Sequence, residues 1–269
     1  MGRGEAFRSV GGRILSALAA IAALMNAAHA SPWARFEGEL LVISSTKYFQ
    51  TDLSTDDPAS GAFESLDSDT HLEFGLTEDI TIGGKVIYGT SWLTNSAGSF
   101  SDSGFSEVEG FVQYQFTRDI RQAASVKLTA GKPAIFQSGA RPTLGGGGAD
   151  IELGALYGRN ILFEPVKIFA AGEIGLRKRI GDAADVVRSQ GTFGVEPDKH
   201  WVFLFETFSV TSLKNENDGG DDYDIVKIQP SVIYRFNRRW AIQAGMTEDI
   251  ETRNVSPGRT YFLGLWSAF

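Results

Sequence analysis

Apolar and polar residues alternate with a period of two along most of the chain after residue 30. In the stretch 106–116, one face carries Val108, Gly110, Val112, Tyr114 and Phe116, and the other carries Glu107, Glu109, Phe111, Gln113 and Gln115. Successive side chains of a β-strand point to opposite faces, so this pattern predicts a strand with one apolar face and one mostly polar face. The stretches 166–178 and 224–236 follow the same pattern, and helical spacing is not evident after residue 30.

The alternation divides the chain into twelve predicted strands. They lie near 34–46, 69–77, 80–91, 106–116, 120–132, 149–158, 166–178, 185–195, 200–212, 224–236, 239–248 and 259–269. The connections between them alternate in length. Short ones fall near 77–79, 117–119, 159–165, 196–199 and 237–238, and longer ones rich in Gly, Ser, Asp and Asn fall near 47–68, 92–105, 133–148, 179–184, 213–223 and 249–258.

Short turns on one side and long loops on the other are typical of a transmembrane β-barrel of the bacterial outer membrane. The sequence therefore predicts an all-β, antiparallel up-and-down barrel of about twelve strands, with short periplasmic turns and longer extracellular loops. An even strand number places both ends of the barrel domain on the periplasmic side. The alternative is a soluble β-sandwich that ends on a core strand.

The first 30 residues have the pattern of a secretory signal peptide. Arg3, Arg8 and Arg13 precede the apolar run "ILSALAAIAALM", and "AHA" at 28–30 supplies a small-x-small cleavage pattern. The run is too short for a transmembrane helix. We therefore expect cleavage after Ala30, export, and a single barrel domain over 31–269 in the outer membrane of a Gram-negative bacterium.

The charge balance excludes some classes of protein. The chain has 25 basic and 33 acidic residues, and the signal segment takes three Arg and one Glu, which leaves 22 and 32 and a net charge of −10. Such a balance disfavours nucleic-acid binding. The chain has no cysteine, so it has no disulfides, and no motif predicts a cofactor or a metal site.

The last ten residues, "TYFLGLWSAF", are apolar up to Phe269. A closed barrel has no free edge, so its last strand must pair with its first, and an apolar final residue then belongs to the structure. The ending also resembles the C-terminal signal that the insertion machinery reads in outer-membrane proteins. Gly264 and Phe269 match that signal, whereas Ser267 departs from it.

The whole chain after residue 30 loosely resembles the proteobacterial outer-membrane family named for meta-pathway phenol degradation. The motifs that carry the resemblance are "FGLTEDITIGGKV" at 74–86 and the ending "GLWSAF". These are turn and assembly features, so they specify a barrel better than a substrate. The resemblance implies a transporter-like barrel of about twelve strands and supplies no functional residue.

Strand parity places seven acids and six bases inside the barrel. This predicted lumen consists of Glu37, Glu39, Glu73, Lys85, Glu109, Lys127, Glu152, Lys167, Glu173, Arg177, Glu206, Lys227 and Arg235. One interpretation is a narrow polar channel for small solutes, and the other is a salt-bridge network that fills the lumen. The predicted first strand leaves no room for a preceding plug, so a plug is expected to be an inward-folded loop, with 133–148 as the candidate.

Two other function classes remain. A barrel lipid hydrolase needs a Ser nucleophile beside a His, but His71 and His200 do not lie in the His-x-Ser arrangement of the outer-membrane phospholipases. We therefore predict that the chain is not an enzyme. A structural or adhesive barrel with a closed lumen is the alternative to a porin or transporter. The expected partners are outer-membrane lipid and lipopolysaccharide, the barrel-insertion machinery and, for a channel, small solutes.

Overall fold

The computed structural model describes residues 31–52, 61–96, 98–133, 148–218 and 220–269, and within them it contains twelve β-strands. The strands are β1 (Leu40–Asp52), β2 (Gly61–Gly75), β3 (Ile80–Asn95), β4 (Gly98–Arg118), β5 (Gln122–Pro133), β6 (Ala149–Leu162), β7 (Lys167–Ile180), β8 (Val186–Glu196), β9 (Trp201–Ser212), β10 (Asp224–Arg235), β11 (Trp240–Arg253) and β12 (Arg259–Ala268). The described residues include no helix long and apolar enough to cross a membrane.

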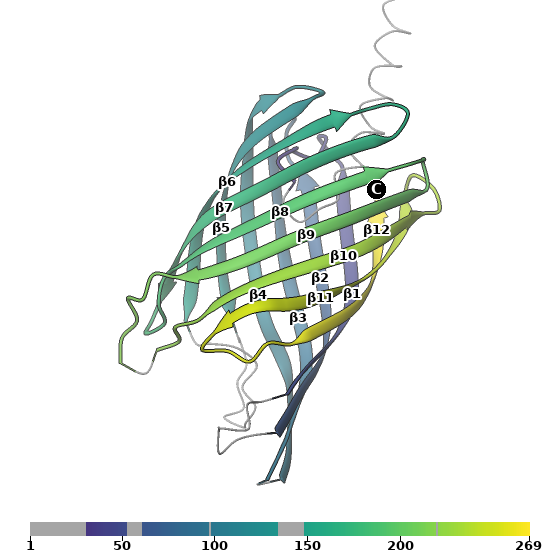
Figure 1. Cartoon of the computed structure of the whole chain (residues 1–269). Coiled ribbons are helices and arrows are strands. Elements are labelled where there is room, and N and C mark those ends of the chain that lie inside the picture. Colours follow the sequence, from purple (N-terminus) through teal and green to yellow (C-terminus); the bar gives the residue numbers. More distant parts are fainter. Residues whose placement is uncertain (1–30, 53–60, 97, 134–147, 219) are drawn as a thin grey trace, which may run out of the picture.

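Each strand pairs antiparallel with its neighbours in sequence, and β1 pairs with β12, which closes the barrel (Figure 1). At the seam, Leu41 lies opposite Ala268 and Gln50 lies opposite Arg259. Leu40 and Phe269 exchange backbone hydrogen bonds of 3.0 and 2.9 Å, so the pairing continues to the final residue. The predicted twelve-stranded up-and-down barrel is confirmed.

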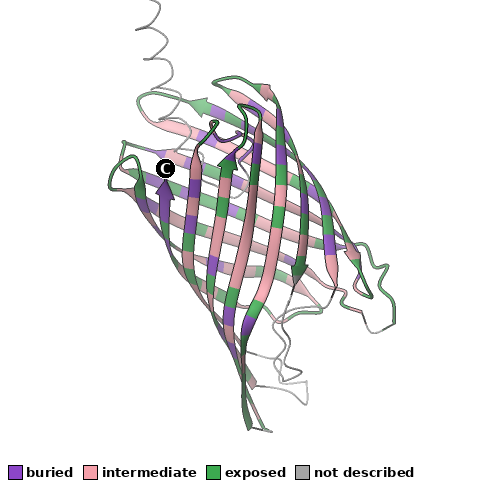
Figure 2. Ribbon diagram, turned by 180° about the vertical axis from the view of Figure 1, so that it is seen from behind, coloured by how far each residue is buried: buried purple, intermediate pink, exposed green. Residues whose placement is uncertain are grey.

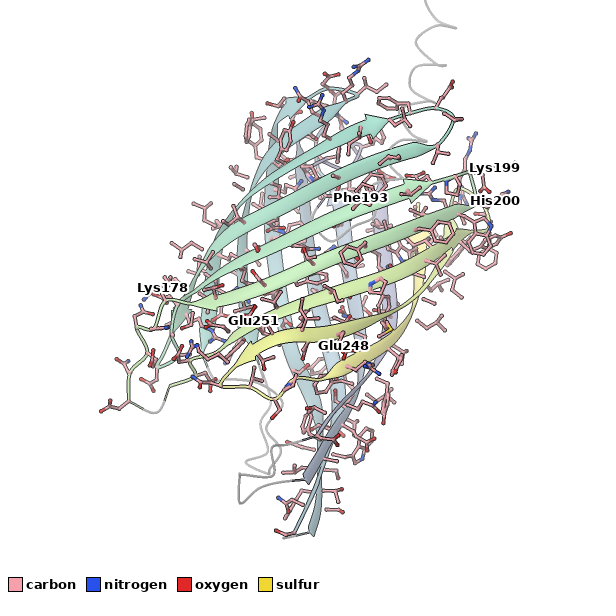
Figure 3. All side chains as sticks on the ribbon, in the orientation of Figure 1. Lys178, Phe193, Lys199, His200, Glu248 and Glu251 are labelled. Carbon is pink, nitrogen blue, oxygen red and sulfur yellow. The ribbon has the colours of Figure 1, made fainter. Side chains whose placement is uncertain are left out.

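The barrel has two different ends. Five short turns, at 76–79, 119–121, 163–166, 197–200 and 236–239, lie at the same end as the C-terminus, and we call this the turn end. The longer connections 181–185 and 213–223 lie at the opposite end, the loop end. Figure 3 shows Lys199 and His200 at the turn end and Lys178 at the loop end.

The outer wall of the barrel is apolar. On β9, Trp201, Phe203 and Phe205 are 41–50% exposed, whereas the alternate residues Val202 and Leu204 are at most 5% exposed. The same alternation runs around the barrel (Figure 2). A barrel contacts lipid through such an outward-facing apolar band, because its backbone N–H and C=O groups are already hydrogen-bonded between strands.

Aromatic side chains gather on this wall at the turn end. The ring centroids of Trp201 and Tyr234 lie 4.8 Å apart, and those of Tyr234 and Phe236 lie 5.2 Å apart. The ring of Phe269 meets Trp240 edge-on at 6.0 Å. Aromatic girdles of this kind mark the interface between the membrane and water. The final residue therefore belongs to the girdle.

The first four strands extend further than the alternation predicts. The segments 47–68 and 92–105 were expected to be loops because the long connections are rich in Gly, Ser, Asp and Asn. The structure instead continues β1 to Asp52, begins β2 at Gly61 and joins β3 to β4 by only residues 96 and 97. The physical reason is that polar residues on these strands face the interior, as Asp67 and Asp69 do, so polarity there does not signal a loop.

Ion pairs and hydrogen bonds order the acidic connections at the loop end. The Asp185 carboxylate accepts hydrogen bonds from Lys178 Nζ (2.8 Å) and Asn215 Nδ2 (2.9 Å). Burial raises the pKa of Asp185, but these bonds and one from the Arg179 backbone N–H outweigh it and bring the pKa down to about 2. Arg253 likewise pairs with Asp222 at 2.7 Å. The acidic stretch 215–224 is therefore tied to the strands around it rather than simply solvated.

Candidate functional site

A charged cavity lies inside the barrel, from its middle toward the loop end. It has a volume of about 410 Å³. Six acidic and six basic side chains line it, together with His71. They are Asp67, Asp69, Glu73, Glu109, Glu152, Glu173, Lys47, Lys85, Lys127, Arg177, Arg188 and Lys227. The equal numbers make the cavity polar without a strong net charge.

Arg177 on β7 is the centre of the ion-pair network. Its Nη2 lies 2.6 Å from Glu109 Oε1, its Nε lies 2.6 Å from Glu152 Oε2, and its Nη1 lies 3.4 Å from Asp150 Oδ2. The Arg177 side chain is only 12% exposed. Because β4 lies three strands away from β7, the contact with Glu109 bridges the interior instead of following the wall.

Most other cations of the cavity are also paired. Lys127 Nζ lies 2.6 Å from Glu173 Oε2, and Lys85 Nζ lies 2.8 Å from Glu107 Oε1. Lys47 contacts Asp69 at 2.6 Å, and Lys227 contacts Asp249 at 3.2 Å. The side chains of Lys47 and Lys227 are about one-third exposed. These two lysines therefore have more contact with water in the cavity than Arg177 does.

The structure places eleven of the thirteen predicted lumen residues on strands with side chains toward the interior. Lys167 and Arg235 share Glu196 near the turn end, at 3.2 and 2.9 Å. Glu206 is 1% exposed and accepts a hydrogen bond from Gln229 Nε2 (2.7 Å), with no cation within ion-pair distance among the described residues. Glu37 and Glu39 differ, because they precede β1 and lie in a turn at the barrel rim.

Sequence reasoning missed several charged residues of the interior. The predicted bounds place Lys47 and Asp67 in a loop and Asp69 at the first residue of a strand, and the predicted lumen omits Arg188 and Glu196 although they alternate in register with Thr192 on β8. The signal that could have found them is parity: each lies an even number of residues from a buried position of its own strand. Among the described residues, no three His, Asp or Glu side chains are grouped to hold a metal ion.

Residues 31–36 fold into the turn end of the lumen, where Figure 1 shows the start of the described chain inside the barrel. The Ala34 N–H donates to Gln115 Oε1 (2.7 Å), and Gln113 Nε2 donates to the Ser31 carbonyl (3.0 Å). Arg35 pairs with Glu73. Gln113, Gln115 and Glu73 all face the interior, so this N-terminal segment is bound to the inner wall of β2 and β4.

This placement corrects two expectations. The first strand was predicted from residue 34, but β1 begins at Leu40. The residues before it were expected to leave no room for a plug, yet the N-terminal segment occupies part of the lumen. Loop 133–148, the predicted plug, lies almost wholly outside the described residues. The segment folds inward because its backbone groups find hydrogen-bond partners on the polar inner wall.

The wall opposite the N-terminal segment is apolar. A cluster of buried side chains on β1, β7, β9, β10, β11 and β12 faces the interior at the turn end. It consists of Leu41, Ile43, Phe169, Val202, Leu204, Ile233, Ala241, Trp266 and Ala268. The interior is thus a charged cavity in the middle and a partly filled, more apolar passage toward the turn end.

A closed barrel with an apolar outer band and a charged interior defines an outer-membrane β-barrel. Comparison with solved structures agrees. The chain is similar to an outer-membrane channel from Pseudomonas putida F1, with a TM-score of 0.71, 14% identity, and coverage of 88% of this chain and 97% of that chain. No protein-family model and no curated protein matches the sequence.

Two further structures share the fold. The translocator domain of the autotransporter NalP from Neisseria meningitidis has a TM-score of 0.56 and 10% identity, over 97% of this chain and 98% of that chain. A KdgM porin in complex with disordered oligogalacturonate has a TM-score of 0.51 and 8% identity, over 84% and 99%. At sequence identities of 8–14%, these similarities concern the fold alone. These neighbours are a channel, a porin and a translocator rather than enzymes.

Proposed function

We propose that the chain is an outer-membrane channel, a narrow porin or transporter for small solutes. The observation that carries the proposal is the charged cavity of about 410 Å³ inside a closed barrel. A barrel of twelve strands lies between eight-stranded barrels, whose interior is filled by side chains, and porins of sixteen or more strands, which hold a water channel. The similarity in fold to an outer-membrane channel and a porin supports the same function.

The lining favours small polar solutes over large or strongly charged ones. Acids and bases are equal in number and mostly paired, so the cavity offers both donors and acceptors without a large field of one sign. The N-terminal segment narrows the passage at the turn end. Transport through this lumen therefore requires that segment to shift, or solutes small enough to pass beside it.

The second candidate is a structural or adhesive barrel with a closed lumen. The observation that favours it is that the N-terminal segment and the apolar cluster together occupy the turn end. A barrel that folds correctly and never conducts would support this function. We further propose that residues 1–30, which lie outside the described residues, are a cleaved signal peptide. The insertion machinery would read Gly264 and Phe269, and lipopolysaccharide would contact the loop end.

Charge reversal at an exposed lumen lysine tests the channel directly. In Lys227→Glu, a carboxylate replaces a one-third-exposed cation beside Asp249, and we expect the reversal potential in a salt gradient to move toward cation selectivity. Lys85→Glu should act in the same direction. The matched control is Lys132→Glu, because Lys132 is exposed on β5 and shares the outward parity of that strand. Equal shifts in all three variants would contradict conduction through this cavity.

A further inference from the structure

A second cavity lies at the turn end, separate from the charged cavity in the middle of the barrel. Its volume is about 390 Å³, within the range of small-molecule sites. Its floor consists of inward-facing apolar side chains: Leu41, Ile233, Ala241, Trp266 and Ala268. Trp266 is held in place because its Nε1–H donates to Gln243 Oε1 at 3.1 Å.

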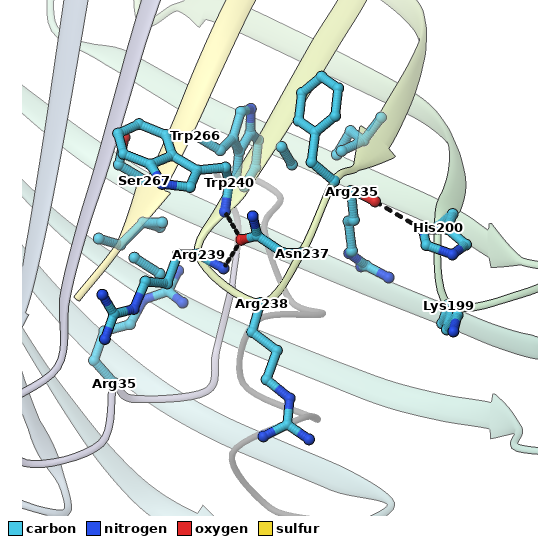
Figure 4. Close-up of a pocket in the computed structure, with 15 residues that line it drawn as sticks. Arg35, Lys199, His200, Arg235, Asn237, Arg238, Arg239, Trp240, Trp266 and Ser267 are labelled. Atoms are coloured by element: carbon cyan, nitrogen blue, oxygen red, sulfur yellow. Dashed lines mark hydrogen bonds between the residues drawn. The ribbon is translucent and has the colours of Figure 1, made fainter.

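Cations surround the mouth of this pocket (Figure 4). Arg35 and Arg235 pair with carboxylates of the inner wall, Glu73 and Glu196. Lys199, Arg238 and Arg239 have no ion-pair partner among the described residues. Asp198 supplies a negative charge near Lys199, whereas Arg238 and Arg239 add positive charge at the mouth of a pocket whose floor is apolar.

The turn that carries two of these cations is ordered by its own hydrogen bonds. Asn237 Oδ1 accepts hydrogen bonds from the backbone N–H groups of Arg239 (2.8 Å) and Trp240 (3.0 Å). On the neighbouring turn, Asp198 Oδ1 accepts from the backbone N–H groups of His200 and Trp201, and these bonds lower the pKa of Asp198. Asp198 is thus held in its own turn with its charge close to Lys199, and Arg238 and Arg239 are the cations that keep the mouth of the pocket positive.

We propose that this pocket binds a small amphipathic anion, a carboxylate with an apolar alkyl or aryl body. The apolar body would lie against Trp266 and Ile233, where burial of each CH₂ group favours binding. The carboxylate would lie among Lys199, Arg238 and Arg239, which repel metal ions and other cations. An uncharged sugar would leave these cations unpaired and its own hydroxyl groups without partners on the floor.

Isothermal titration of the refolded mature chain in non-ionic detergent tests the proposal, with octanoate and its neutral analogue octanamide as probes and protein-free micelles as the blank. We expect saturable binding of octanoate and at least roughly tenfold weaker binding of octanamide. In Arg238→Glu/Arg239→Glu, both changes lie in a solvent-exposed turn, so the fold is kept and octanoate affinity should fall roughly tenfold or more. Arg121→Glu, on a different turn at the same end, is the matched control and should bind as the unaltered chain does.

A second variant changes the apolar floor of the pocket instead of its charged mouth. Ala241→Phe places a ring in the pocket without changing its charge, and octanoate binding should be lost while the barrel still folds. The proposal is overturned if octanoate gives no saturable heat up to about 10 mM, if octanamide binds equally well, or if the double charge reversal has no effect. Binding is measured without conductance, so a failure here is distinguishable from a failure of the proposed channel.

Discussion

Arg177→Ala is expected to destabilise the barrel by about 3–5 kcal/mol, because removing one member of a buried ion-pair group leaves its partners uncompensated. The Glu109, Asp150 and Glu152 side chains that Arg177 contacts are at most 12% exposed. Without the guanidinium, these three carboxylates would share a small volume, with Arg188, Lys85 and Arg179 as the nearest remaining cations. The free energy of unfolding in urea, measured on the chain refolded into lipid vesicles, gives the magnitude.

Arg188→Ala is the control from the same network. Arg188 contacts only Glu152 (3.1 Å) in this group, and its side chain is 39% exposed, so its loss should cost no more than about 1 kcal/mol. A destabilisation of similar size in both variants would show that the network is well hydrated and that Arg177 is not its centre.

Gly158→Leu is expected to displace the N-terminal segment and raise single-channel conductance severalfold. Gly158 faces the lumen on β6, and a Cβ there would lie 2.5 Å from the Trp33 ring and 2.7 Å from Pro32. No side chain fits at that distance, so either the segment moves or the barrel distorts. Since the barrel wall is held by backbone pairing on both sides, the segment is the part that yields.

Gly110→Leu is the matched control, because a Cβ at this outward-facing position on β4 meets only the Gly83 carbonyl oxygen, at 3.9 Å. The chain has no cysteine, so a Ser31→Cys substitution reports on the segment independently. Ser31 is 8% exposed, so the introduced thiol should react slowly with a polar maleimide alone and quickly when combined with Gly158→Leu. Unchanged labelling and conductance would mean that the segment does not restrict the lumen.

The barrel could be predicted from the sequence because its two faces have opposite chemistry. The strand 106–116 alternates between lipid-facing Val112 and Tyr114 and interior Glu109 and Gln113, and β4 contains that segment. The same parity located Glu109, Glu152 and Arg177 on the inner wall. It could not show that Arg177 joins β7 to β4, since closure of the barrel brings these side chains together across the interior.

Two features of the interior could not be predicted from the alternation of apolar and polar residues. Lys47 and Asp67 fall in a predicted loop because a polar lumen makes strand composition resemble that of a loop. The inward fold of residues 31–36 depends on hydrogen bonds to Gln113 and Gln115, whose partners Ser31 and Ala34 lie 82 and 81 positions away in sequence. No local spacing records such a contact. The segment has neither the alternation nor the length of an independent element.

The central claim is that the charged lumen conducts. We would measure single-channel currents of refolded residues 31–269 in a planar lipid bilayer, beside the Gly158→Leu variant. Discrete conductance steps in the unaltered chain, and larger steps in the variant, are the predicted result. A correctly folded barrel that stays silent over a range of voltages in both forms would contradict the account and favour a structural or adhesive barrel.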